Sequence, residues 1–292
     1  MYARLFSARS WLVAIAVALA LPGWAIARAN AGGGFYQQTN LTSNLPGIAK
    51  FTDPNLTNPW GISSAPGGPF WFSDNGSGKS TLYDNKGAPQ SLVVTIPPSP
   101  GGKMGTPTGT VFNSDITAFI VSKKGISGAS LFLFDTEDGT ISGWSLGVDM
   151  THAILAVDNS SSGAVYKGLA LGTNRSGIFL YATNFHAGTI DVFNKKFAPA
   201  RLSGSFTDPS LPQGYAPFGI NNINGKLYVT YTKQNAQKNC RLTHKFAKTG
   251  RYASEEECRL KPSVAVSEPE CGPTSTTETV LLCFSERLCY AF

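Results

Sequence analysis

Residues 59–83 read PWGISSAPGGPFWFSDNGSGKSTLY, and this stretch decides the fold. A glycine followed by an aliphatic residue, Gly61-Ile62, leads through a short loop into an apolar run, a polar turn and a second apolar run. Short aromatic and β-branched runs between Gly- and Asp-rich turns are typical of antiparallel strands. The stretch therefore predicts a small antiparallel sheet with Gly61 early in its first strand.

The same template recurs three more times along the chain. Its glycines are spaced 48, 59 and 51 residues apart, at Gly61, Gly109, Gly168 and Gly219. A propeller blade takes about 40 to 50 residues, so each repeat predicts one blade, with a solenoid of β-hairpins as the alternative. We expect glycine in inner strands because they crowd around the axis. In the second repeat we expect Ala118–Val121 to form a blade strand, and Asp138-Gly139 to form a hairpin turn.

A longer repeat supports the propeller. FTDPNLTNPWGI, starting at Phe51, returns as FTDPSLPQGYAPFGI, starting at Phe206. The offset from Asp53 to Asp208 is 155 residues, which is three repeats. In a six-bladed ring, three blades would place the two segments on opposite sides of the axis.

These motifs resemble a family of exported, mostly bacterial proteins of uncharacterised function. The resemblance rests on TDPNLTNPWGIS (pattern TDPNLxNPWGI), PFWFSDNGSGKSTLYD, TEDGTISGW and YATNFHAGTIDVF (pattern FHxGxIDVF), and covers roughly residues 40–237. It implies a six-bladed, TolB-like and NHL-like β-propeller and export, but no activity. The family continues for about two more blades after the position of Lys238, so the resemblance implies that this all-β propeller is incomplete, with about four blades.

The N-terminus has the order of a secretory signal. Arg4 and Arg9 precede an apolar run, Trp11–Leu21, and a small-x-small site ends at Ala31. The alternative is a membrane anchor, but the run is short for a bilayer of about 30 Å. We therefore expect cleavage of residues 1–31, a secreted or periplasmic protein, and no membrane span in the mature chain.

Composition changes abruptly near Lys238. Before it the acidic residues are ten Asp and one Glu, and after it seven Glu and no Asp. All five cysteines lie in the tail, at Cys240, Cys258, Cys271, Cys283 and Cys289. A disulfide-stapled module, a flexible tail and a lost reading frame are the alternatives. The simultaneous shifts favour the last. We therefore divide the chain into a signal (1–31), a partial propeller (32–238) and an aberrant, poorly ordered tail (239–292) that forms no blade.

Charge argues against a nucleic-acid partner. Residues 32–238 hold 14 basic and 11 acidic residues, a net charge of +3, and no basic run interleaved with aromatics.

Oxygen-bearing side chains gather on one predicted rim, where outer-to-inner connections meet the turns between second and third strands. The candidate ligand-binding residues there are Asp53, Asp74, Asn75, Glu137, Asp138, Asn184, His186 and Asp208. They could hold Ca²⁺ or a polar ligand. The alternative is that these Asp and Asn residues only form turns, and that His186 is a surface histidine rather than a base.

We predict a non-catalytic binding or scaffold module with a small-molecule, glycan or protein ligand. The alternative is a Ca²⁺-dependent, lactonase-like propeller hydrolase, which needs carboxylate and amide ligands in the central channel. The predicted inner strands read WGISS, TGTVF, KGLAL and FGINN, and supply only Asn221 and Asn222. No nucleophile elbow, P-loop or HExxH motif occurs, so we predict no catalytic residue and no other cofactor.

Overall fold

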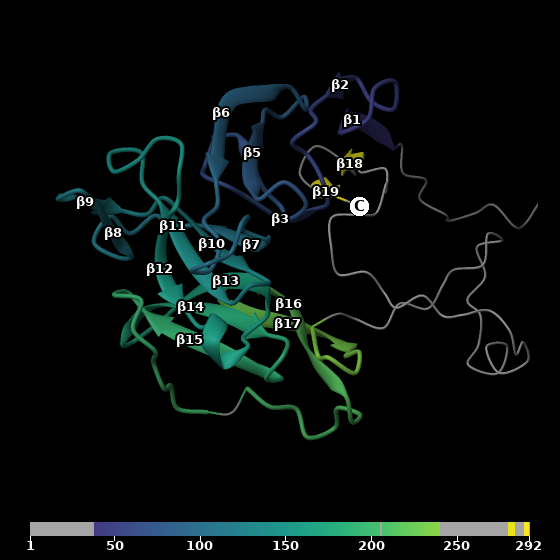
Figure 1. Cartoon of the computed structure of the whole chain (residues 1–292). Helices are drawn as coiled ribbons and strands as arrows, with labels where there is room; N and C mark the ends of the chain where they lie inside the picture. The colour runs from purple at the N-terminus through teal and green to yellow at the C-terminus, as the bar shows by residue number, and fades with distance from the viewer. Residues whose placement is uncertain (1–37, 205, 240–279, 284–288, 292) are drawn as a thin grey trace, which may run out of the picture. The chain divides into compact units, whose positions relative to one another are not determined.

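The computed structural model describes residues 38–204, 206–239, 280–283 and 289–291. Nearly all regular structure in this part of the chain is β-strand, arranged as a succession of small sheets (Figure 1). The one helical element among these residues is a 3₁₀ turn, Ser160–Ser162. The predicted all-β class is confirmed.

The first two blades are four-stranded antiparallel sheets. In blade 1 the order is β3-β4-β5-β6, and the strands span Pro59–Ser64, Phe70–Asp74, Lys79–Tyr83 and Pro89–Thr95. In blade 2 the order from the inner strand outward is β7-β10-β11-β12, and the strands span Pro107–Phe112, Phe132–Thr136, Thr140–Trp144 and Ile154–Asp158. Each pairs neighbouring strands as a meander, which is the construction of a propeller blade.

The next two blades have fewer strands among the described residues. Blade 3 has the order β13-β14-β15, with strands Tyr166–Asn174, Gly177–Asn184 and Thr189–Asn194. Blade 4 has two strands, β16 (Tyr215–Ile223) and β17 (Lys226–Lys233). Each predicted repeat thus corresponds to one sheet, and the prediction of an all-β, propeller-type fold is confirmed.

The four glycines lie on the inner strands, as predicted, and three of them show the expected crowding between inner strands. A Cβ on Gly61 would lie 2.5 Å from the carbonyl oxygen of Thr108, and one on Gly109 would lie 2.5 Å from the backbone nitrogen of Leu169. Both neighbours belong to the inner strand of the next blade. Gly61, Gly109 and Gly168 therefore allow adjacent inner strands to approach each other, whereas a Cβ on Gly219 would meet only the Thr230 hydroxyl of its own blade.

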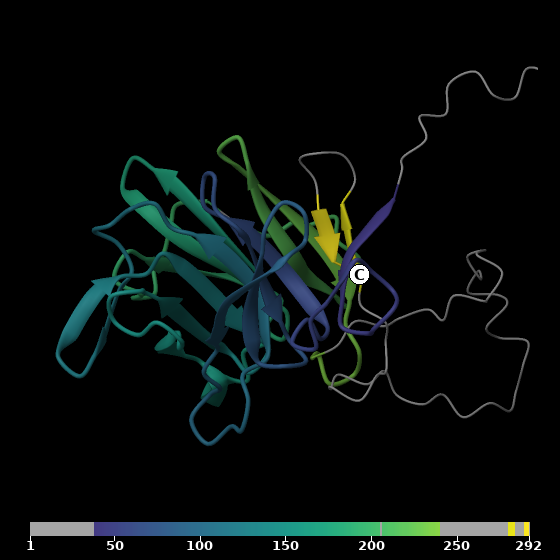
Figure 2. The ribbon, with the colours of Figure 1, turned by 90° about the horizontal axis from the view of Figure 1, so that it is seen from above.

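The expected strand Ala118–Val121 was misplaced. Residues Ile120–Lys123 (β8) pair with Ile126–Ala129 (β9) in a separate hairpin between the first and second strands of blade 2. Figures 1 and 2 both show this hairpin projecting beyond the sheets. This segment does form a strand, but the strand pairs with the neighbouring segment Ile126–Ala129 and not with a strand of blade 2.

Apolar side chains between neighbouring blades form the core. The indole of Trp71 on blade 1 stacks on Phe132 of blade 2, with ring centroids 4.1 Å apart, and lies 4.8 Å from Trp144. Trp71, Phe132 and Trp144 are each at most 4% exposed. Burial of large aromatic faces between sheets is the main stabilising contribution in such a fold.

One more sheet joins the two ends of the described chain. It has the order β19-β18-β1-β2, with strands Cys289–Ala291, Val280–Cys283, Thr39–Ser43 and Phe51–Thr52. Strands β18 and β19 coincide with the apolar patch of the tail, and β18 pairs antiparallel with β1. This pairing differs from the poorly ordered tail that was expected. The other tail residues lie outside the described part, so the separate tail region 239–292 stays a prediction.

The predicted signal, residues 1–31, also lies outside the described residues. Within the described ranges, no helix has the length and apolar character needed to cross a membrane.

Candidate functional site

Strand register places equivalent residues at the same end of successive blades. Just beyond the second strands of blades 1, 2 and 3 lie Asn75, Glu137 and Phe185. Immediately before the inner-strand glycines of the four blades lie Trp60, Thr108, Lys167 and Phe218. Inner strands start, and second strands end, on the same face of a propeller, so these two sets can meet there.

They meet around Lys167, a buried cation. Its ammonium nitrogen lies 5.0 Å from the ring centroid of Trp60, 5.7 Å from that of Phe185 and 5.9 Å from that of Phe218. The same nitrogen forms an ion pair with Glu137 Oε1. Only 1% of the Lys167 side chain is exposed, against 19% of Glu137. Aromatic faces and a carboxylate together compensate the cost of burying this charge.

The cluster joins residues that are distant along the chain. Trp60 of blade 1 and Phe218 of blade 4 have ring centroids 5.6 Å apart, and both rings are half-buried. Asn75 Nδ2 donates a hydrogen bond of 2.9 Å to Glu137 Oε2, and Asn58 Nδ2 donates one of 3.2 Å to Asn75 Oδ1. The name axial cluster is used below for Asn58, Trp60, Asn75, Glu137, Lys167, Phe185 and Phe218.

A second buried carboxylate lies close to this cluster. Asp135 Oδ1 accepts a hydrogen bond from the backbone N–H of Gly109 and lies 2.9 Å from the Thr108 hydroxyl, whereas the buried Oδ2 has no hydrogen-bond partner. Burial raises the pKa of Asp135 to about 6, although these hydrogen bonds and the charge of Lys167 oppose the shift. Asp135 therefore titrates nearer to neutral pH than an ordinary aspartate.

Two predicted candidates belong to blade 1 and its preceding loop, not to the axial cluster. Asp53 accepts a 2.8 Å hydrogen bond from the Tyr83 hydroxyl and a 2.9 Å bond from the backbone N–H of Asn55. Asp74 accepts a 2.7 Å bond from the Thr81 hydroxyl, and its buried Oδ1 has no partner. Burial raises the pKa of Asp74 well above its ordinary value. The Asp53–Tyr83 contact ties the loop before blade 1 to β5, and the Asp74–Thr81 contact links β4 with β5.

Three further candidates lie at or beside the turns between the second and third strands of blades 2 and 3. Asp138 accepts a hydrogen bond from the backbone N–H of Ser99. Asn184 donates a 3.0 Å bond to Asp191 Oδ2 and accepts a 3.2 Å bond from the backbone N–H of Ala187, within the β14–β15 turn. His186 lies half-buried in the same turn. The Asn184–Ala187 contact matches the alternative of turn formation, whereas the Asp138 contact joins the β10–β11 turn to the segment that precedes blade 2.

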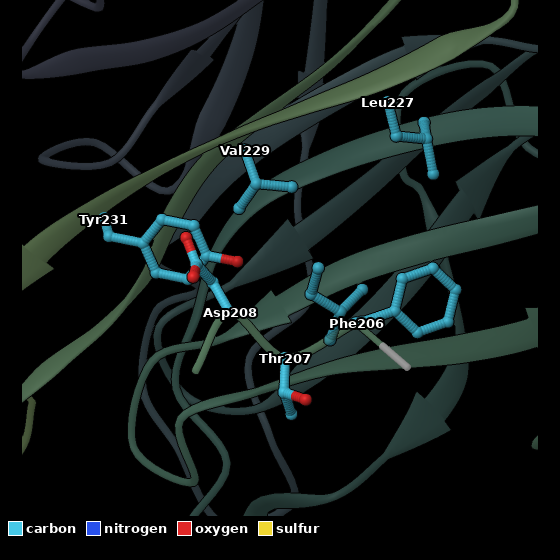
Figure 3. Close-up of a pocket in the computed structure, with 7 residues that line it drawn as sticks. Phe206, Thr207, Asp208, Leu227, Val229 and Tyr231 are labelled. Carbon is cyan, nitrogen blue, oxygen red and sulfur yellow. The ribbon is translucent and has the colours of Figure 1, made fainter. Parts of the chain in front are cut away.

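Asp208 lies apart from the others, beside a pocket between blades 3 and 4 (Figure 3). Its Oδ1 accepts hydrogen bonds from the backbone N–H (2.9 Å) and hydroxyl (2.6 Å) of Ser210, which lower its pKa. The carboxylate is therefore ionised at neutral pH. Of the eight candidates, the structure brings only Asn75 and Glu137 into direct contact in the axial cluster.

Sequence reasoning missed Lys167 and Asp135. The inner-strand segment KGLAL contains no carboxylate, amide or His ligand, and a lysine is not a ligand for Ca²⁺. Asp135 reads as one polar residue at the end of an apolar strand. The available signal was positional, because Lys167 precedes a repeat glycine just as Trp60 and Phe218 do.

The predicted carboxylates are already engaged by protein groups, as described above. Among the described residues, no group of three or more His, Cys, Asp or Glu could hold a metal ion. The geometry of this part of the chain does not favour the metal-dependent hydrolase alternative.

The fold defines the chain as a β-propeller-type protein. No family model matches it. The chain is 31% identical over 202 residues to uncharacterized protein L690 of Acanthamoeba polyphaga mimivirus, covering 66% of this chain and 51% of that protein. It is 30% identical over 200 residues to uncharacterized protein R648 of the same virus, covering 66% and 48%. With uncharacterized protein R640 the match covers 48% of this chain and 26% of that protein, at 31% identity. The chain thus spans about half or less of these relatives.

Among solved structures, the chain is similar to a streptogramin B lyase, with a TM-score of 0.40, 15% identity, and coverage of 60% of this chain and 48% of that one. Virginiamycin B lyase from Staphylococcus aureus has a TM-score of 0.38, 15% identity, and coverage of 69% and 71%. No activity passes from these proteins to this chain at such identities. The resemblance to an exported bacterial family stays a prediction.

Proposed function

We propose that this protein is an exported β-propeller that binds a ligand at the axial cluster without transforming it. The observation that carries the proposal is the convergence of Lys167 with Glu137, Trp60 and Phe218, which come from all four blades. Burying a cation costs free energy unless the cation is paired. Turns at the surface can form without a buried cation, so turn formation alone does not account for Lys167. The same face is where we predict propeller ligands from the sequence.

The cluster retains unused binding capacity. A carboxylate has about four acceptor positions, of which Glu137 commits two in its contacts with Lys167 and Asn75. The half-buried rings of Trp60 and Phe218 present apolar faces beside it. A ligand that combines a ring or other apolar face with hydroxyl or N–H donors fits this set. A glycan or a small polar ring compound meets both requirements.

The ligand experiment uses Trp60 as a built-in reporter. We propose to titrate the full chain with neutral oligosaccharides and with small ring-containing metabolites, following tryptophan fluorescence and calorimetric heat. Glu137→Gln should weaken binding about tenfold, because a hydrogen bond to a charged group contributes about 1.5 to 3 kcal/mol. Tyr228→Ala, at an exposed position on blade 4, is the matched control. Binding that is equal in both variants would contradict the axial site.

Calcium binding is tested by measuring the melting temperature of the full chain. If the rim holds Ca²⁺, adding the ion should raise the melting temperature through mass action, and chelator should reverse the shift. The triple change Asp74→Asn, Glu137→Gln and Asp138→Asn should then abolish the shift. A Ca²⁺-dependent shift would reopen the hydrolase alternative.

Export is a separate part of the proposal. The signal pattern supports cleavage after Ala31, so N-terminal sequencing of exported protein should begin at Gly32. Recovery of an intact Met1 outside the cell would contradict the assignment.

A further inference from the structure

Among the described residues, blade 4 has no third strand, which the other three blades have. The second strands of blades 1, 2 and 3 each pair antiparallel with a third strand, namely β5, β11 and β15. No described residue pairs with the corresponding edge of β17, which forms a two-stranded sheet with β16. An open strand edge presents unpaired N–H and C=O groups, which is the template for adding another strand.

A pocket of about 220 Å³ lies beside this edge. Leu227 and Val229 of β17, Ile190 of β15 and Phe206 of the loop between the blades supply its apolar lining. Figure 3 shows Leu227, Val229 and Tyr231 in a row along β17, with Phe206 and Asp208 facing them from the loop. The pocket therefore lies along the strand edge that lacks a partner, with alternate β17 side chains opening into it.

The charges along this strand define the partner. By the two-residue period of a strand, Lys233 is on the same face of β17 as Leu227 and Val229. Asp208 supplies an ionised carboxylate near Tyr231. A segment running antiparallel to β17 would pass Lys233 first, then Tyr231 and Asp208, and last the apolar end of the pocket. Charge complementarity then calls for an acidic residue, a basic residue and two aliphatic residues at alternate positions.

A second copy of this chain fits the edge less well. Lys226 and Lys233 begin and end β17. Two copies of β17 paired antiparallel about their centre would place Lys226 of one opposite Lys233 of the other. Like charges directly opposite each other destabilise a strand pair.

We propose that the free edge of β17 and its pocket bind an extended peptide of a partner protein by strand addition, with the pattern acidic-x-basic-x-aliphatic-x-aliphatic. The backbone of the peptide takes the place of the missing third strand, and its two aliphatic side chains enter the pocket over Val229 and Leu227. This surface is separate from the axial cluster.

The probe is the acetylated and amidated heptapeptide ETRTVTL, titrated into the full chain by calorimetry. Two control peptides isolate the mechanism. The first carries N-methyl groups on alternate amides, so that it keeps its side chains but cannot pair along one edge. The second replaces both aliphatic residues with serine, which removes the side chains that enter the pocket and keeps the backbone that pairs with β17. Each control should bind at least tenfold more weakly than the probe.

Protein variants test the pocket itself. Val229→Asp should weaken peptide binding at least tenfold, and Val229→Thr, which keeps the shape and therefore the fold, should weaken it about threefold. Tyr228→Ser, at the neighbouring position on the opposite face of β17, should leave affinity within twofold of the original. Circular dichroism and melting temperature would confirm folding of each variant.

The following results would overturn the proposal. Failure of the full chain to bind the heptapeptide would mean that the edge is closed or occupied by the chain itself. A dimer in sedimentation velocity that Val229→Asp dissociates would make a second copy the occupant. Equal binding of the N-methylated peptide would exclude strand addition. None of these results bears on ligand binding at the axial cluster, which is measured with other variants.

Discussion

Substituting Gly109 with alanine should separate blades 2 and 3. The added Cβ would lie 2.5 Å from the backbone nitrogen of Leu169, 2.6 Å from the Leu169 Cβ and 2.7 Å from Asp135 Oδ1. The first of these atoms belongs to the backbone of β13, so no flexible side chain can move aside to relieve the contact. Overpacking of this kind costs about 1 to 3 kcal/mol, and we expect the upper end because the Gly109–Asp135 hydrogen bond is also disturbed.

The assay is urea unfolding followed by tryptophan fluorescence, with Gly147→Ala as the control. A Cβ on Gly147 would meet nothing within 4 Å, and its φ is not in the left-handed region. The control should therefore change the free energy of unfolding by less than about 1 kcal/mol in either direction. A loss of about 3 kcal/mol should lower the melting temperature by roughly 6 to 12 °C. Equal stability of the two variants would refute the close contact between inner strands.

Three further predictions concern stability. Trp144→Ala should cost about 3 to 5 kcal/mol because its side chain is buried between blades, whereas His186→Ala in a surface turn should cost less than about 1 kcal/mol; equal losses in urea unfolding would contradict the blade packing. Lys167→Met leaves Glu137 without its buried cation and should lower the free energy of unfolding by about 3 to 5 kcal/mol. The control Lys123→Met should lower it by less than about 1 kcal/mol, because the Lys123 side chain, which pairs with Asp149, is 41% exposed. A small loss for Lys167→Met would mean that the axial ion pair is not buried. Asp135 has a folded-state pKa of about 6, above its ordinary value of 3.8, so the folded state binds the proton more tightly and stability should fall as pH rises from about 4 to 6; Asp135→Asn should remove this part of the slope in unfolding curves measured across that range.

Much of the blade architecture could be predicted from local patterns. The antiparallel sheet expected in residues 59–83 forms as β3, β4 and β5, and the three further repeats of its template form the sheets of blades 2 to 4. The turn at Gly139 was also expected, and its φ of +81° is a conformation that glycine adopts without strain. These features depend on residues that are neighbours in sequence, where alternation and turn chemistry act directly.

The candidate site was predicted only in part, for a different reason. The expected rim correctly included Asn75 and Glu137, which share a hydrogen bond. It also included Asp53 and Asn184, which accept hydrogen bonds from backbone N–H groups of their own loop and turn. Aspartate and asparagine favour both turns and ligand sites, so residue type alone could not separate the two roles.

The sequence by itself determined the propeller class, the number of blades before Lys238, the positions of the inner-strand glycines and the break in composition after Lys238. Each of these follows from patterns that repeat along the chain. Only the tertiary structure decided that Trp60, Glu137, Lys167 and Phe218 meet in one cluster, that three of the four inner-strand glycines face the next blade, and that β18 pairs with β1. These contacts join residues up to 244 positions apart (Thr39 and Cys283). Their formation depends on how far each blade rotates relative to the last, which no local pattern of residues encodes.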